Sequence, residues 1–218
     1  VSLFAILFAL PFGLSVSIYM SEVANPKVRS WLKPIIELLS GIPSVVYGFF
    51  GLIVIVPLIQ KLFDLPVGES GLAGSIVLAI MALPTIITVT EDAMRNCPRA
   101  MREASLALGA SQWQTIYKVV IPYSISGITS GVVLGIGRAI GETMAVLMVT
   151  GNAAVIPTTI LEPLRTIPAT IAAELGEAPA AGPHYQALFM LGVVLFFITL
   201  IINFSVEYIS SKGLKRSK

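Results

Sequence analysis

The chain of 218 residues is 56% hydrophobic and only 12% charged, roughly half the ~25% charged residues of an average soluble domain. This composition favours a membrane protein, and the net charge of +2 gives no support to nucleic-acid binding. The single cysteine, Cys97, excludes an intramolecular disulfide and a cysteine-based metal cluster. Because the first residues carry no basic leader and no cleavage signature, we do not expect residues 1–20 to be a signal peptide.

Five apolar windows are each long enough to cross a bilayer as a helix, which needs about 20 residues. They cover residues 1–20, 34–59, 71–89, 123–150 and 187–208. The sequence therefore predicts an all-α, polytopic integral membrane protein, with one transmembrane domain over residues 1–218. Since the chain starts without Met and already inside an apolar run, we expect a sixth span before Val1.

The distribution of Lys and Arg between the two sides of the membrane predicts the orientation of the chain. Only Lys61 and Arg165 fall on the side of the 151–186 loop, whereas the side of the 92–122 loop is rich in basic residues. This asymmetry places the 92–122 loop and the C-terminus in the cytoplasm of a cell-membrane protein. The basic residues on that side are Lys27, Arg29, Lys33, Arg95, Arg99, Arg102, Lys118, Lys212, Lys215, Arg216 and Lys218.

Prolines interrupt two of the predicted spans. Pro43 and Pro84 each remove a backbone hydrogen bond and are expected to kink their helices. In lipid a kink is tolerated where a neighbouring helix or a water-lined path satisfies the freed carbonyl. We interpret both prolines as hinges of pathway-lining helices, although kinks needed only for packing would explain them equally well.

The most polar internal run, residues 92–122, lies between the third and fourth spans. Its pattern predicts two short helices joined at a bend. Pro98 suits the first turn of the first helix, and Gly109 can take the left-handed conformation that ends it. Ser111, with Gln114 three residues later, is typical of a capping box that starts the second helix. Such a helix–glycine–helix knob is a shape that a partner protein can grip.

The spacing within this knob resembles the coupling loop of ABC-importer permeases: Glu-Ala-Ala, three residues, Gly, nine residues, then aliphatic, any residue, aliphatic, Pro. Ser105 replaces the second Ala of that pattern. In that family the loop docks into a groove on the ATP-hydrolysing subunit, so the resemblance implies an ATPase-coupling role. An ordinary helix–turn–helix is the alternative. The matching positions are Glu103, Ala104, Ser105, Gly109, Val119, Ile121 and Pro122.

Two ionisable residues, Arg138 and Glu142, lie inside the fourth predicted span. At a spacing of four residues they share one helix face with Gly127, Gly131 and Gly135, and small residues at this spacing let another backbone approach. A charge in the bilayer core costs about 2.5–3.5 kcal/mol and is accepted where it is paired or faces an interior path. Arg138 suits two-bond recognition of a phosphate-type anion, but the spacing also fits a structural ion pair.

Glu142 adds a possible source of selectivity at the same place. Its carboxylate is able to accept a hydrogen bond from an anion that still carries a proton, as phosphate does near neutral pH, and it repels a fully ionised anion such as sulfate. The run 135–141 is similar to a dinucleotide-binding glycine pattern, but no strand precedes it, so helix packing is the better interpretation.

Two further runs narrow the resemblance. Residues 41–48 (GIPSVVYG) and 137–146 (GRAIGETMAV) resemble phosphate-specific transport permeases, their C-type subunits more than their A-type subunits. The resemblance implies a permease subunit of an ATP-driven phosphate importer, with Arg138 and Glu142 on the transport path and no catalytic residue. It also implies a second, A-type permease, two ATPase subunits that bind ATP and Mg²⁺, and an extracytoplasmic phosphate-binding protein. A permease for sulfate, molybdate or phosphonate, and an ATP-independent anion channel, are the alternatives.

The 151–186 loop contains five prolines and is therefore not one continuous helix. We expect a short helix over residues 168–175, and the loop is a candidate surface for a solute-delivering partner. His184, the only histidine, has no second metal ligand nearby in the sequence and is interpreted as a surface residue.

Overall fold

The computed structural model describes residues 1–180 and 182–216, and the side chains of Glu207 and of residues 209–216 lie outside this description. Of the basic residues that predict the orientation, Lys218 therefore lies outside the described residues, and the side chains of Lys212, Lys215 and Arg216 lie outside the description. The described residues contain no β-strand, and one isolated bridge joins Gly151 to Leu164. The all-α prediction is confirmed.

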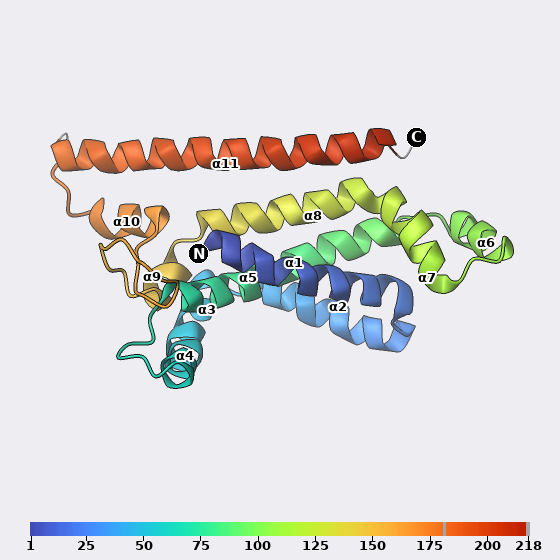
Figure 1. Cartoon of the computed structure of the whole chain (residues 1–218), viewed down its shortest axis with the longest axis horizontal. Helices are drawn as coiled ribbons and strands as arrows, with labels where there is room; N and C mark the ends of the chain where they lie inside the picture. Colours follow the sequence, from blue (N-terminus) through green and yellow to red (C-terminus); the bar gives the residue numbers. More distant parts are fainter. Residues whose placement is uncertain (181, 217–218) are drawn as a thin grey trace. The chain divides into compact units, whose positions relative to one another are not determined.

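The helices of the described residues follow one another along the chain (Figure 1). Three π-helical turns, at Tyr19–Val23, Gly51–Ile55 and Ile116–Val120, extend or join them. The α-helices are α1 (Ser2–Ile18), α2 (Pro26–Gly41), α3 (Ser44–Phe50), α4 (Val56–Leu62), α5 (Gly71–Arg95), α6 (Arg99–Ala107), α7 (Gln112–Thr115), α8 (Ile121–Gly141), α9 (Met144–Val149), α10 (Ile167–Glu174) and α11 (Pro183–Arg216).

Within the described residues, five helical stretches are long and apolar enough to cross a membrane, which agrees with the number predicted. They are Ser2–Val23, Ser44–Leu62, Gly71–Arg95, Gln112–Gly141 and Pro183–Val206. The second and the fourth depart from their predictions by a break in the helix.

The second span is not one helix over residues 34–59, and that prediction was wrong. The helix α2 ends at Gly41, and α3 begins at Ser44 with Pro43 as its N-cap residue at ψ 142°. Because proline disfavours the α conformation of the residue before it, Ile42 is not helical and α2 ends at Gly41. Pro43 therefore separates two helices instead of kinking one, whereas Pro84 does lie inside α5.

The fourth span also differs from its prediction of one helix over residues 123–150. It starts earlier, because α7, a π-helical turn and α8 follow one another without a break from Gln112. It ends at Gly141, and Glu142 and Thr143 form a non-helical link to α9. The side chain of Glu142 accepts a hydrogen bond from the N–H of Ala145 at 3.2 Å, which satisfies an N–H that α9 itself leaves without a partner.

The chain divides into two compact units, and each is described by itself. One unit comprises Val1–Ala9, Ile42–Ala82 and Ile136–Ile202, and the other comprises Leu10–Gly41, Leu83–Gly135 and the segment from Asn203 onward. The helices α1, α5, α8 and α11 each contribute residues to both units.

In the unit that contains the coupling knob, glycines bring α8 close to α5. A Cβ atom added at Gly127 would lie 2.3 Å from the Cβ of Ala93, and one added at Gly135 would lie 2.6 Å from Ile86. One added at Gly131 would lie 2.9 Å from the hydroxyl of Thr90. The prediction that this glycine stripe faces a neighbouring helix is confirmed.

In the other unit, α3 packs against α9 in the same manner. A Cβ atom added at Gly48 would lie 2.8 Å from the Cα of Ala145, and one added at Gly51 would fall between Val77 and Val149. Ala145 and Val149 are fully buried. Close backbone approach thus joins the segment that follows Pro43 to the segment that follows Glu142.

The close contact at Gly127 predicts a stability difference between two otherwise similar substitutions. In Gly127→Ala the new methyl group forces α8 away from α5, and we expect a loss of about 1–3 kcal/mol. Gly137 is the control, because nothing lies within 4 Å of a Cβ added there. Gly137→Ala should be neutral or stabilising by about 0.5–1 kcal/mol. Thermal unfolding of the two detergent-solubilised variants measures the difference, and equal stability would contradict the packing described here.

Candidate functional site

The knob between α5 and α8 has the predicted form. The helix α6 ends before Gly109, which has a φ of +85°. The hydroxyl of Ser111 accepts the N–H of Gln114 at 3.3 Å, and the N–H of Ser111 donates to the Gln114 side chain at 2.8 Å. The predicted bend and capping box are confirmed. Pro98 is the N-cap residue of α6, one position before the first turn in which it was expected.

Residues of the ABC-importer pattern divide into exposed and packed positions. Glu103, Ala104 and Gly109 are exposed. Val119 and Ile121 pack against a buried cluster that consists of Met94, Cys97, Val120 and Ile128. The first part of the pattern is therefore at the surface, whereas the later part fixes the knob to its own helices.

Ser105, which departs from the pattern, has a clear structural role. Its hydroxyl lies 2.9 Å from the hydroxyl of Thr115, which is 5% exposed, so the two side chains form a hydrogen bond between α6 and α7. A second alanine at this position would leave the Thr115 hydroxyl without that partner. The surface of the knob also carries large exposed apolar side chains, as an interaction surface does: Met101, Leu106, Leu108, Trp113 and Tyr117.

An ion pair that was not predicted from the sequence joins this knob to the end of the first span. Arg102 of α6 lies 3.0 Å from the carboxylate of Glu22, whose side chain is 8% exposed. Arg102 also donates to the backbone carbonyl of Met94, and Gln112 donates to the backbone carbonyl of Glu22. The available signal was an acidic residue directly after an apolar window, on the side that is rich in basic residues.

The two ionisable residues of the fourth span lie on either side of a helix end. Arg138 is in the last turn of α8 and is half-buried, and Glu142 follows that helix. The expectation that they share one face of a continuous helix near its middle was wrong. Arg138 interacts electrostatically with Tyr47 of α3, a residue that is 7% exposed. The runs 41–48 and 137–146, far apart in the sequence, meet where Gly48 packs against Ala145.

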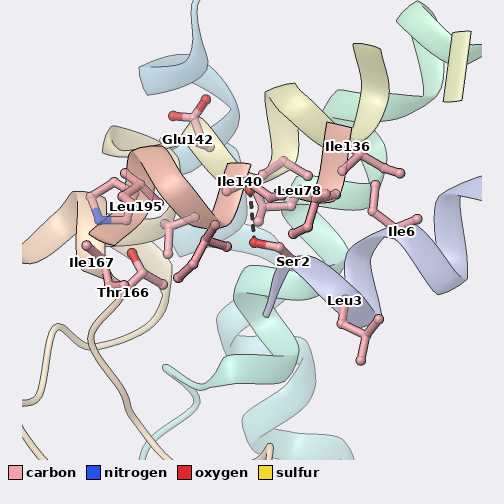
Figure 2. A pocket seen from close by; sticks show the side chains of 15 residues that line it. Ser2, Leu3, Ile6, Leu78, Ile136, Ile140, Glu142, Thr166, Ile167 and Leu195 are labelled. Atoms are coloured by element: carbon pink, nitrogen blue, oxygen red, sulfur yellow. Dashed lines mark hydrogen bonds between the residues drawn. The ribbon is translucent and has the colours of Figure 1, made fainter. Parts of the chain in front are cut away.

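A cavity of about 440 Å³ lies beside Glu142, and its lining is mostly apolar (Figure 2). Residues of α1, α5, α8, α9, α10 and α11 supply that lining together with Glu142, and Arg138 is not part of it. The hydroxyl of Ser2, at the cavity wall, donates to the carbonyl of Ala139 at 3.1 Å. In Figure 2 the carboxylate of Glu142 points away from Ser2. The cavity is therefore suited to apolar groups and not to an anion.

The backbone next to Arg138 and Glu142 is exposed. Gly137 and Gly141 are exposed, and nothing of this chain lies within 4 Å of a Cβ atom added at either. Glycines therefore expose the backbone beside both ionisable residues.

The most buried ionisable residue of the described chain was also missed. Glu91 of α5 is 1% exposed and lies 2.6 Å from Arg29, 2.9 Å from Lys33 and 3.8 Å from Arg95. Lys33 pairs with Asp92 as well. Burial lowers the pKa of the Lys33 ammonium, but its hydrogen bonds to Asp92 and Glu91 outweigh that effect, so the pKa lies above its usual value. Lys33 belongs to α2, which is not among the five candidate spans.

In the 151–186 loop, α10 (Ile167–Glu174) corresponds to the short helix predicted over residues 168–175. Its last residue, Glu174, pairs with Arg165 and lies 3.2 Å from the ring of His184. The histidine side chain is 55% exposed, as its interpretation as a surface residue required.

Comparison with known proteins places the chain in a family. The family model "binding-protein-dependent transport system inner membrane component" matches residues 9–213. A probable ABC transporter permease, YqgH of Bacillus subtilis, is 41% identical over 97% of this chain and 69% of its own length. The phosphate transport system permease protein PstC of Mesorhizobium japonicum is 38% identical over 95% of this chain and 69% of its own. PstC 1 of Mycobacterium tuberculosis is 35% identical over 99% and 69%.

Among solved structures, an inward-facing MetNI methionine ABC transporter has a TM-score of 0.75, with 19% identity over 97% of this chain and 90% of that chain. An amino acid ABC transporter has a TM-score of 0.58 at 13% identity, over 99% and 88%. These two likenesses support the fold alone. The family model and the sequence relatives lead to one conclusion: the chain belongs to the binding-protein-dependent transport system inner membrane components, the permease subunits of ABC importers.

Proposed function

We propose that this chain is the permease subunit of an ATP-driven importer of inorganic phosphate, and that Arg138 and Glu142 lie on the route of the anion. As a permease of this family it is a transport component of the cell membrane and not an enzyme, and a separate subunit hydrolyses ATP. The observation that carries the choice of phosphate is the similarity to phosphate permeases, at 35–38% identity over 91–99% of the chain.

The helix end between Arg138 and Glu142 explains how two charges are accommodated in a span. Arg138 lies in the last turn of α8, where the carbonyl end of the helix dipole stabilises a cation. Glu142 lies two residues before the start of α9, and its carboxylate accepts a hydrogen bond from the N–H of Ala145, a group that α9 itself leaves unpaired. Interrupted helices of this kind form the binding sites of many transporters. Each charge thus sits at the helix end that stabilises it.

The exposed backbone at Gly137 and Gly141 supports a route that a second chain completes. Arg138 would bind phosphate through two parallel hydrogen bonds, and Glu142 would accept a hydrogen bond from the anion that still carries a proton. The proposed assembly contains an A-type permease, two ATPase subunits that bind ATP and Mg²⁺, and an extracytoplasmic phosphate-binding protein. The 92–122 loop and the C-terminus would face the cytoplasm.

The two compact units give a physical basis for the hinge roles proposed for Pro43 and Pro84. The boundary between the units falls between Gly41 and Ile42, and again between Ala82 and Leu83. Each proline therefore lies within two residues of a boundary. Each also interrupts backbone hydrogen bonding, so bending at these points breaks few additional bonds.

For the coupling knob we propose that the exposed Glu103, Ala104 and Gly109 contact the ATPase. The remaining residues of the pattern would hold α6, α7 and α8 together, so that the knob moves as one piece when the ATPase contacts it. These residues are Ser105, Val119, Ile121 and Pro122. The ion pair between Arg102 and Glu22 would connect the same knob to the first span.

Removal of the guanidinium tests the proposed route. In Arg138→Gln we expect phosphate uptake to fall by at least tenfold, because a charge-assisted hydrogen bond contributes about 1.5–3 kcal/mol. The measurement is radiolabelled phosphate uptake in cells, together with co-purification of the ATPase to verify assembly. Lys61→Gln, which removes an exposed basic residue from α4, serves as the control and should transport normally. Undiminished uptake by an assembled Arg138→Gln complex would exclude the proposed role.

Neutralising the carboxylate tests the proposed source of selectivity. In Glu142→Gln the repulsion of a fully ionised anion is lost, and we expect sulfate to compete with phosphate several-fold better than in the unsubstituted complex. Inhibition of phosphate uptake by a series of sulfate concentrations measures the change. Glu177→Gln, at an exposed position of the 151–186 loop, should leave the inhibition curve unaltered. The same curve for Glu142→Gln would show that Glu142 does not discriminate between the anions.

The pair at the knob gives a test of coupling. Arg102→Gln leaves the carboxylate of Glu22 buried without its cation, and we expect fewer phosphate ions imported for each ATP hydrolysed. Arg99→Gln removes an exposed arginine from the same helix and should have no effect. The double variant Glu22→Gln, Arg102→Gln contains no unpaired charge and should recover part of the coupling. Transport and ATPase rates measured in proteoliposomes decide between these outcomes, and equal ratios for Arg102→Gln and Arg99→Gln would refute the coupling role.

A further inference from the structure

The cluster around Glu91 contains more cationic than acidic side chains. Arg29 and Lys33 come from α2, and Arg95 comes from α5, so three cations surround one buried carboxylate. The exposed Asp92 is the second acid of the group, and it pairs with Lys33. Because α5 leads directly into α6, this cluster lies on the membrane side of the coupling knob, away from Arg138 and Glu142 along the chain.

The hydrogen bonding of the cluster is incomplete. The Nε atom of Arg29 is buried without a hydrogen-bond partner. Oε1 of Glu91 lies 2.6 Å from Arg29 Nη2, yet no contact of this oxygen has hydrogen-bond geometry. A buried network that is only partly satisfied is held less strongly than a complete one. The side chains of Arg29 and Lys33 are 22% and 26% exposed, so both extend from the buried carboxylate to the surface.

An open groove of about 350 Å³ lies at that surface, on α2 itself. Arg29, Ser30 and Lys33 line it, together with Glu37 and two prolines. Arg29 and Lys33 are one helical turn apart, and the hydroxyl of Ser30 lies between them in the sequence and donates to the carbonyl of Lys27. The groove extends from Pro26 to Glu37 along α2, and its two cations, Arg29 and Lys33, lie in the first half of that helix.

We propose that this groove is a second anion site of the chain, that it takes a phosphate group, and that Glu91 holds its two cations while it is empty. A guanidinium and an ammonium one turn apart match the oxygens of a phosphate group. Inorganic phosphate and the headgroup of an anionic lipid share this chemistry. An anion in the groove competes with Glu91 for Arg29 and Lys33. Occupancy would therefore weaken the attachment of α2 to α5.

The position of α2 makes both sources of phosphate accessible. Its large exposed apolar side chains recur at helical spacing, as in helices that lie at a membrane surface. The basic residues of the groove, Arg29 and Lys33, lie on the rest of the helix circumference. Basic side chains are expected in this position on a helix at the depth of lipid headgroups. The exposed apolar residues of α2 are Val28, Trp31, Ile35, Leu38 and Leu39.

The competition predicts that loss of the carboxylate increases anion binding. The experiment uses the permease–ATPase complex without its binding protein, in nanodiscs, with Arg138→Gln present so that the proposed route does not contribute. Addition of Glu91→Gln should raise the affinity for inorganic phosphate in phosphatidylcholine discs, or the retention of phosphatidylglycerol in mixed discs, by about tenfold or more. Further substitution of Arg29 and Lys33 by Gln should abolish the gain, whereas Lys27→Gln on the same helix should not.

The two kinds of disc identify the source of the phosphate group. A gain for inorganic phosphate supports a site for the free anion, and a gain for phosphatidylglycerol supports a headgroup site. No gain in either disc, or a gain that persists without Arg29 and Lys33, overturns the proposal and leaves Glu91 as a structural ion pair. If Glu91→Gln does not assemble, Lys33→Gln and Lys27→Gln are compared with Glu91 intact. Weaker anion binding by the first alone supports the site, and equal binding overturns it.

Discussion

The cost of moving a charged side chain from water into lipid governs the arrangement of this chain. It amounts to about 2.5–3.5 kcal/mol for a single charge at the centre of a helix. A break between α8 and α9 provides both a carbonyl end near Arg138 and free N–H groups near Glu142. At the other ionic cluster, three cations surround the buried carboxylate of Glu91. In each case the surrounding structure compensates a charge that lipid alone would exclude.

The features that the sequence predicts well are those with a local cause. The capping box at Ser111 and the positive φ of Gly109 follow from a few neighbouring residues. The glycine stripe of α8 follows from helical spacing within one continuous segment. The breaks after Gly41 and Gly141 were not predicted, because an apolar window measures composition and not continuity. The assumption of one continuous helix then placed Arg138 and Glu142 on a common face, which the structure does not support.

Long-range ion pairs have no local signal, and both that matter here were missed. Lys33 is 58 residues from Glu91 in the sequence, and Glu22 meets Arg102 across five intervening helical segments. Each acidic residue lies at or just beyond the edge of a predicted span, where a solvated position is the ordinary expectation. Only the packing of α2, α5 and α6 shows that Glu91 is fully buried and Glu22 nearly so.

The distribution of burial along the spans indicates how this chain fits into an assembly. In α5, 61% of the apolar window is buried within the chain, whereas in Pro183–Val206 of α11 the figure is 6%. The helix α5 is therefore an internal support, and lipid or other subunits must cover α11. The exposed glycines Gly137 and Gly141 would leave one side of the proposed anion route open within this chain. In the proposed assembly, a second permease would cover these glycines and close that side.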